Sequence, residues 1–128
     1  MTQHTNINSE LLSERDTLAE GLAYHRNGDF QSAEAIYRKV YVNNPSCADV
    51  PHLSGLILYH FGEPDSAAYS IRRAIVLDDS KPHYHYNLGV VLLEQGEIQE
   101  AKACLAKALS LNPNYQLARS MLKDIENI

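Results

Sequence analysis

The chain has 128 residues, of which 11 are Lys or Arg and 16 are Asp or Glu, giving a formal net charge of −5 at pH 7. Hydrophobic residues make up 45% and charged residues 21%, which is typical of one folded domain and not of a disordered chain. The acidic excess disfavours a nucleic-acid partner, and no apolar run is long enough to span a bilayer. We therefore expect no nucleic-acid and no membrane partner.

The beginning of the chain is polar. Residues 1–8 lack the basic and apolar regions of a secretory signal, and we expect a flexible tail there, with Ser9 as a candidate cap of the first helix. The two cysteines, Cys47 and Cys104, do not make a disulfide framework, which favours a reducing compartment. We expect a cytoplasmic protein with a single domain over 9–128.

The glycines repeat with a constant period. They form two sets in which neighbours are 34 residues apart: Gly21, Gly55 and Gly89 in one, and Gly28, Gly62 and Gly96 in the other. Alanines at 33, 67 and 101 keep the same period. A fixed period of this length indicates stacked supersecondary units, which we place at 14–47, 48–81 and 82–115.

Each unit is predicted to be a helix, a turn and a helix. In the third unit, Gly96 separates an apolar run over 86–93 from a run over 98–109 with helical periodicity. The first glycine set leaves room where the two helices cross, and the second set can adopt positive φ just past a helix end. An apolar stripe over 115–127 predicts a final helix that caps the open end of the stack.

This pattern resembles the tetratricopeptide repeat family. The third unit matches the family signature through Leu88-Gly89, Ala101 and Pro113, and the first and second units match it through their glycines and alanines. The family's large aromatic residue near the start of each first helix is missing, and its positions hold Thr17, Pro51 and His85, so we expect weaker packing there. The resemblance implies an all-α fold, a right-handed solenoid of helical hairpins forming an α-α superhelix.

The resemblance also implies a function. Members of this family bind partner proteins along a concave groove lined by the first helix of each repeat, and residues spaced i, i+3, i+7 and i+10 share a face of such a helix. The candidate partner-binding residues are Arg15, Leu18, Leu22, His25, His52, Leu56, Tyr59, His83, Tyr86 and Val90. An apolar row flanked by Tyr and His suits an amphipathic helix or an extended peptide.

Several alternatives remain open for this row and for the chain. The leucines could simply pack against neighbouring helices, or the groove could be filled by the chain's own tail or by a second copy. The chain could also be a homo-oligomerisation module, or an accessory domain that serves a glycosyltransferase or methyltransferase. The Lys, Arg and Asn clamp with which some family members hold a C-terminal carboxylate is absent here, apart from Asn87.

Catalysis and cofactors have little support in the sequence. No phosphate-binding loop, nucleophile elbow or HExxH motif occurs, so we expect no enzyme activity and no cofactor. The six histidines include no pair spaced i, i+4, so we expect no metal site. Histidines 25, 52, 60 and 83 could instead strengthen binding of acidic peptides at pH 5.5. The basic residues Arg38, Lys39, Arg72, Arg73 and Lys107 are interpreted as a solvated outer ridge.

Overall fold

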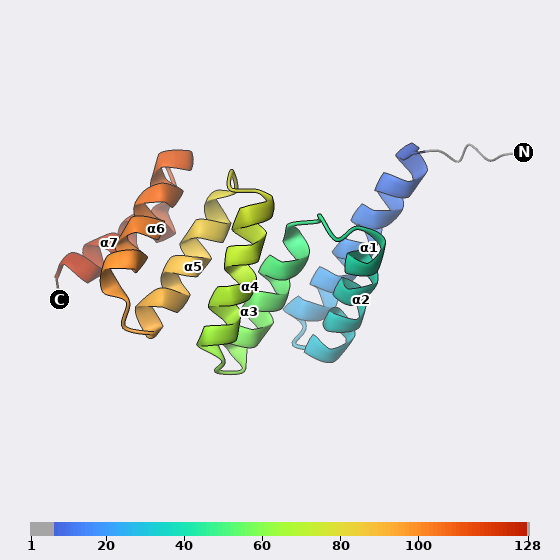
Figure 1. Ribbon diagram of the computed structural model, residues 1–128, viewed down its shortest axis with the longest axis horizontal. Coiled ribbons are helices and arrows are strands. Elements are labelled where there is room, and N and C mark those ends of the chain that lie inside the picture. Colours follow the sequence, from blue (N-terminus) through green and yellow to red (C-terminus); the bar gives the residue numbers. More distant parts are fainter. Residues whose placement is uncertain (1–6, 128) are drawn as a thin grey trace, which may run out of the picture. The chain divides into compact units, whose positions relative to one another are not determined.

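The computed structural model describes residues 7–127, with side chains from residue 14 onwards, and within this range the chain forms helices and no strand (Figure 1). The helices are α1 (Ile7–Arg26), α2 (Phe30–Asn43), α3 (Asp49–His60), α4 (Pro64–Leu77), α5 (Pro82–Glu94), α6 (Ile98–Leu111) and α7 (Gln116–Glu126). The predicted all-α fold class is confirmed. The chain divides after Val50 into two compact units, and a single domain over 9–128 stays a prediction.

The start of α1 differs from the sequence expectation. This helix begins at Ile7, so Ser9 lies inside it and does not cap it. Ile7 and Asn8 are helical, whereas the rest of the predicted flexible tail lies outside the described residues.

The first unit is a helical hairpin of α1 and α2. Its crossing point is Gly21, where an added Cβ would lie 2.7 Å from Cε1 of Tyr37 on α2. The Tyr37 side chain is 1% exposed, so it cannot move aside into solvent. Only a residue without a side chain lets the two helices approach this closely, which confirms the predicted role of this glycine.

The second unit holds the α3–α4 and α5–α6 hairpins, followed by α7 (Figure 1). An added Cβ would lie 2.8 Å from Cγ1 of Ile71 at Gly55, and 3.1 Å from the Leu105 side chain at Gly89. The helices α4 and α5, α5 and α6, and α6 and α7 pack against one another. One apolar core of this unit consists of Ala67, Ala68, Ile71, Leu88, Val91, Leu92 and Ala101.

The turns inside the hairpins share one backbone conformation. Gly28, Gly62 and Gly96 have φ values of 82°, 77° and 82°, and an added Cβ at these positions would meet no atom within 4 Å. The glycines are therefore needed for the left-handed backbone and not for close approach. This confirms the prediction that the second glycine set ends the first helices.

The turns after the second helices repeat as well, through a pattern that we did not derive from the sequence. Asn44, Asp78 and Asn112, each 34 residues from the next, follow the ends of α2, α4 and α6. Their side-chain oxygens accept the backbone N–H two residues later, at 3.0–3.2 Å. Such side-chain turns hold the backbone after a helix end without a glycine. At Asp78 the Ser80 hydroxyl and N–H lower the pKa of the carboxyl group.

The last helix covers the side of α6. Ala118 and Ile125 of α7 are buried against Leu105 and Ala108. Arg119, Lys123 and Glu126 are exposed on α7, as the sequence predicts for a helix that ends a stack. No helix within the described residues is both long and apolar enough to cross a membrane.

Two of the three positions at which the family's aromatic residue is missing are buried, and weaker packing there stays a prediction. Pro51 and His85 are buried, and Nε2–H of His85 donates to the backbone carbonyl of Asp79 at 2.9 Å. Tyr84, next to His85, is 1% exposed and supplies aromatic bulk one position earlier than the family signature places it.

Candidate functional site

Two side-chain bridges join the first helices of the second unit, α3 and α5. Asn87 donates from its side-chain N–H to Nε2 of His52 at 2.9 Å, and the Tyr59 hydroxyl donates to Oε1 of Glu94 at 2.9 Å. Both bridges link residues 35 positions apart, and the repeat period is 34. One residue corresponds to a turn of about 100° around a helix axis. The bonded residue of α5 therefore lies on a different side of its helix from the residue that occupies the same repeat position on α3.

His52 does not have the position that the sequence analysis assigned to it. This side chain was predicted to line an open groove, but it is 4% exposed. Its ring stacks against Tyr84 at 4.5 Å and meets His83 edge-on at 5.2 Å between ring centroids. Because Asn87 donates to Nε2, the ring is a hydrogen-bond acceptor there. His52 is therefore part of the support between α3 and α5 and not a surface contact.

A mixed apolar and aromatic surface surrounds the second bridge, and we name it the α3–α5 face. It consists of Leu56, Tyr59, Tyr86, Val90, Leu93 and Glu94. The first five side chains are half-buried and Glu94 is exposed. Leu56, Tyr59 and Leu93 pack on the core of the second unit. Tyr86, Val90 and Glu94 follow one another at i, i+4 and i+8, which places them on one side of α5.

Three tyrosines on or beside this surface take part in a ring contact or have a raised pKa. Tyr86 and Tyr115, which directly precedes α7, have ring centroids 5.3 Å apart. Burial raises the pKa of Tyr59, and the Glu94 hydrogen bond, the Glu94 charge and the Tyr86 hydroxyl raise it further. Burial and Tyr86 likewise raise the pKa of Tyr115. Tyr86 and Tyr115 are therefore in ring contact, and Tyr59 lies on α3 with its hydroxyl bonded to Glu94 of α5.

The α3–α5 face carries negative charge. Neither α3 nor α5 contains a Lys or Arg. Glu94 carries the full negative charge of the α3–α5 face, and no ion pair joins it to a cation among the described residues. His83 is exposed on α5, outside this surface and next to the buried His52 ring.

The first unit carries the other four candidates on α1. Arg15 is exposed, and Leu18 and Leu22 are half-buried. The fourth, His25, contacts its own hairpin: Nδ1 lies 3.0 Å from the Tyr37 hydroxyl, and its ring meets Phe30 edge-on at 5.5 Å. Burial raises the pKa of Tyr37 to about 12, although the positive charge of Arg26 opposes this shift.

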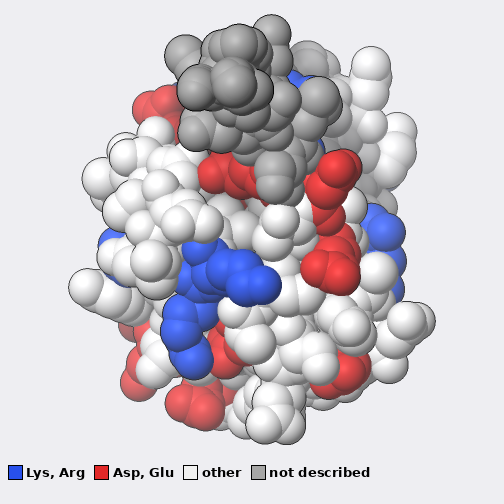
Figure 2. Space-filling model, turned by 90° about the vertical axis from the view of Figure 1, so that its right-hand side faces the viewer, with Lys and Arg blue, Asp and Glu red and all other residues white. Residues whose placement is uncertain are grey.

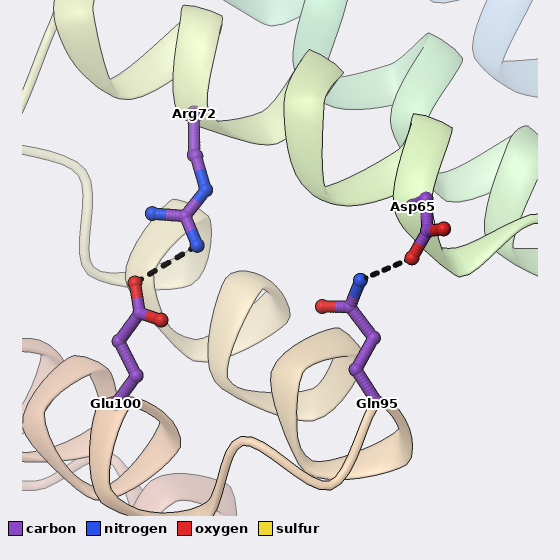
Figure 3. Close-up of polar contacts among 4 residues, drawn as sticks. All are labelled: Asp65, Arg72, Gln95 and Glu100. Carbon is purple, nitrogen blue, oxygen red and sulfur yellow. Dashed lines mark hydrogen bonds and ion pairs between the residues drawn. The ribbon is translucent and has the colours of Figure 1, made fainter.

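The outer side of the second unit is held by polar links of a different kind. Arg72 on α4 pairs with Glu100 on α6 at 2.8 Å, and Gln95 donates to Asp65 at 2.6 Å (Figure 3). The ridge residues are exposed as predicted, but Glu100 neutralises one of them. Figure 2 looks at the side of the molecule that carries α1 and α2, where Lys and Arg side chains lie among Asp and Glu side chains.

No arrangement for metal binding or thiol chemistry is evident in the described part of the chain. Residues 14–127 contain no group of three or more His, Cys, Asp or Glu that could hold a metal ion. Cys47 and Cys104 are half-buried thiols, and burial raises the pKa of each. A raised pKa lowers the thiolate fraction, which makes both cysteines poor nucleophiles.

The comparisons with known proteins were made over both sequence and structure. The tetratricopeptide repeat family matches residues 18–85 and, through a second profile of the same family, residues 82–115. The human Superkiller complex protein 3 is 33% identical over 93 residues, which cover 71% of this chain and 6% of that protein. The chain therefore spans a small part of the curated relative that it matches.

Solved structures of similar fold come from several kinds of protein. A mutant of the Thermobaculum terrenum O-GlcNAc transferase superposes with a TM-score of 0.85 at 31% identity, over 98% of this chain and 23% of that one. The Yersinia enterocolitica secretion chaperone SycD, solved in complex with a YopD peptide, has a TM-score of 0.79 at 19% identity, over 97% of both chains. The first repeat domain of Spaghetti, solved with an HSP90 peptide, has a TM-score of 0.81 at 20% identity, over 89% of this chain and 90% of that one. The glycine period, the helical hairpins and a family match over more than half of the sequence together show that this chain belongs to the tetratricopeptide repeat family.

Proposed function

We propose that this chain is a non-catalytic scaffold that binds a segment of a partner protein on its first helices, with the α3–α5 face as the main contact. The observation that carries the proposal is the half-buried row of Leu56, Tyr59, Tyr86 and Val90 beside two interhelical bridges. Tyrosines give a large contact area with a polar tip and lose little conformational entropy on binding. Arg15, Leu18, Leu22, His25 and His83 are proposed as additional contacts.

The structural neighbours support a peptide as the ligand class. SycD and Spaghetti, which share this fold, were each solved with a bound peptide. A preformed surface of helices joined by hydrogen bonds pays little ordering cost when a segment docks on it. The net charge of −5 and the Arg72–Glu100 ion pair on the outer ridge support the further proposal that nucleic acid is not the partner. We also propose that the protein works in the cytoplasm without a cofactor.

The test is affinity capture from the native lysate, followed by mass spectrometry, with two variants that make the same chemical change at different sites. Val90→Lys puts a charge into the α3–α5 face, whereas Val76→Lys puts it on the outer side of α4, where the valine is 86% exposed. We expect partners to be retained by wild type and Val76→Lys and lost by Val90→Lys, after circular dichroism has shown that all three are folded. If both variants retain the same partners, the α3–α5 face is not the binding site.

A second function is favoured by one comparison. The O-GlcNAc transferase neighbour contains this fold in 23% of its chain and is 31% identical to the present sequence. The chain is therefore also a candidate for an accessory domain that positions substrates for a transferase. A transferase that co-purifies through the α3–α5 face would support this reading. Mass measurement over a range of concentrations would reveal the third possibility, a homo-oligomerisation module.

A further inference from the structure

We propose that the segment bound on the α3–α5 face is an apolar peptide with a Lys or Arg that pairs with Glu94, and not an acidic peptide or a free C-terminal carboxylate. This inference rests on the proposed function, since it names the chemistry of the partner for the same surface. It starts from the charge of the two first helices of the second unit, where Glu94 is exposed and no Lys or Arg occurs on α3 or α5.

The position of Glu94 favours a cation over water alone. Tyr59 donates its hydroxyl to Oε1 of Glu94 at 2.9 Å, which fixes the carboxylate beside the phenol ring. The structure records this bond on Oε1, and a carboxylate has about four lone-pair sites, so acceptor capacity remains for a guanidinium or ammonium group. Fixing one oxygen in advance reduces the entropy that an incoming charged side chain would otherwise have to pay.

The aromatic neighbours add a second attraction for a cation. The rings of Tyr86 and Tyr115 lie 5.3 Å apart, and the Tyr59 ring lies beside Glu94 through its hydroxyl bond. The faces of tyrosine rings carry partial negative charge and attract Lys and, more often, Arg. A carboxylate beside a tyrosine ring is therefore chemically suited to a cation with an apolar stem.

An acidic ligand has the opposite fit. A carboxylate that approached the Tyr86–Val90–Glu94 side of α5 would meet a like charge at Glu94 and no Lys or Arg on either first helix. The charge pattern of this surface therefore differs from what a ligand such as the HSP90 peptide SRMEEVD, solved on Spaghetti, would need. Like-charge contacts in an interface lower affinity and reject wrong partners.

The experiment is a selection of short random peptides displayed on phage against the full chain, followed by affinity measurements on the enriched peptides. Four proteins are compared: wild type, Glu94→Gln, Val90→Lys and, as a matched control, Glu97→Gln at an exposed turn position. We expect wild-type peptides to combine apolar residues with Lys or Arg. Glu94→Gln should weaken their binding by about three- to tenfold, in line with a partly exposed charge pair. Glu97→Gln should leave binding unchanged, and added salt should weaken binding to wild type more than to Glu94→Gln.

The outcomes separate the two proposals. Peptides that need Val90 but are acidic or uncharged, or that bind Glu94→Gln as well as wild type, would overturn the inference and leave the proposed function standing. Peptides that bind Val90→Lys as well as wild type, or a selection in which nothing is enriched, would overturn the proposed function together with this inference.

Discussion

We name the places where the two helices of a hairpin cross the hairpin seams, and in every repeat a glycine of the first helix (Gly21, Gly55 or Gly89) meets the second helix there. The other side of the first helices, the inner side, presents different side chains at equivalent repeat positions. His25 and Tyr59 are 34 residues apart and occupy the same repeat position, yet His25 contacts Tyr37 of its own hairpin and Tyr59 bridges to the next first helix. The seams preserve the backbone arrangement, and this frees the inner positions to vary. Under the proposed function, stability and recognition depend on separate residues of the same helices.

The largest effect is expected at the seams. Gly55→Leu places its Cβ 2.8 Å from Ile71 and 3.1 Å from the backbone oxygen of Ala67, which cannot rotate away. We expect a loss of at least about 3 kcal/mol in the free energy of unfolding, measured in urea. Gly89→Leu should cost less, because its nearest atoms belong to the flexible Leu105 side chain.

A matched substitution checks that this effect comes from the seam. Ala103→Leu adds the same apolar bulk at an exposed position on α6 and should change stability by less than about 0.5 kcal/mol. If Gly55→Leu were as stable as Ala103→Leu, the close approach of α3 and α4 would not be needed for the fold.

The His52–Asn87 bridge should have a moderate effect. Asn87→Ala removes this hydrogen bond from the buried His52 ring, at a cost of about 1–3 kcal/mol in the free energy of unfolding. The polar group that His52→Ala leaves behind, the Asn87 amide, is only half-buried. A double-mutant cycle in urea should give a coupling energy of about 1 kcal/mol between the two positions. Additive single effects would show that the bridge contributes nothing beyond packing.

The stability contributed by Tyr37 in the first hairpin should decrease at alkaline pH. Burial raises the pKa of Tyr37 from its ordinary value of 10.0 to about 12, so the folded state holds this proton more tightly than the unfolded state. Stability contributed by the protonated phenol is complete below pH 10 and decreases as the pH rises towards 12. An ultraviolet titration should show one late phenolate that is missing in Tyr37→Phe; identical titration curves for the two proteins would contradict a buried Tyr37.

The smallest effect concerns the repeated turn at Asp78. Because Ser80 lowers the pKa of this carboxyl group, its contribution is present above the unfolded pKa and is lost as the pH falls through the folded value. Asp78→Asn reproduces the residue found at 44 and 112, so it should preserve stability at neutral pH and remove this part of the acid dependence. Acid unfolding curves of the variant and wild type that coincide would contradict a lowered pKa.

The seams could be predicted from the sequence because their residues repeat. Three glycines at a constant spacing can only be explained by a structural requirement that recurs in each unit, and the close contacts at Gly21, Gly55 and Gly89 confirm it. The resemblance to the family also predicts that the first helices supply the binding surface, and this stays a prediction. The turn residues at 44, 78 and 112 repeat too, but one is Asp and two are Asn, so that the shared acceptor oxygen was easy to miss.

The inner side could not be predicted to the same degree. Aligning residues at the repeat period groups Leu22, Leu56 and Val90, but the actual contacts join residues 35 apart. Residues at the same repeat position differ in burial because their neighbours on the adjacent helix differ. The neighbour of His52 is Tyr84 on α5, one residue before the position of the family's aromatic residue. No periodic signal encodes such single pairings, so sequence analysis placed His52 at the surface.

The central claim is that the partner segment binds on the α3–α5 face. The most direct measurement is an NMR titration of the isotope-labelled chain with the tightest peptide from the selection, following the backbone amide signals. We predict the largest shift changes on α3 and α5 around Tyr59, Val90 and Glu94, and small changes around Val76 on α4. Changes concentrated on α4 and α6, with α3 and α5 unaffected, would contradict the account and move recognition to the outer helices.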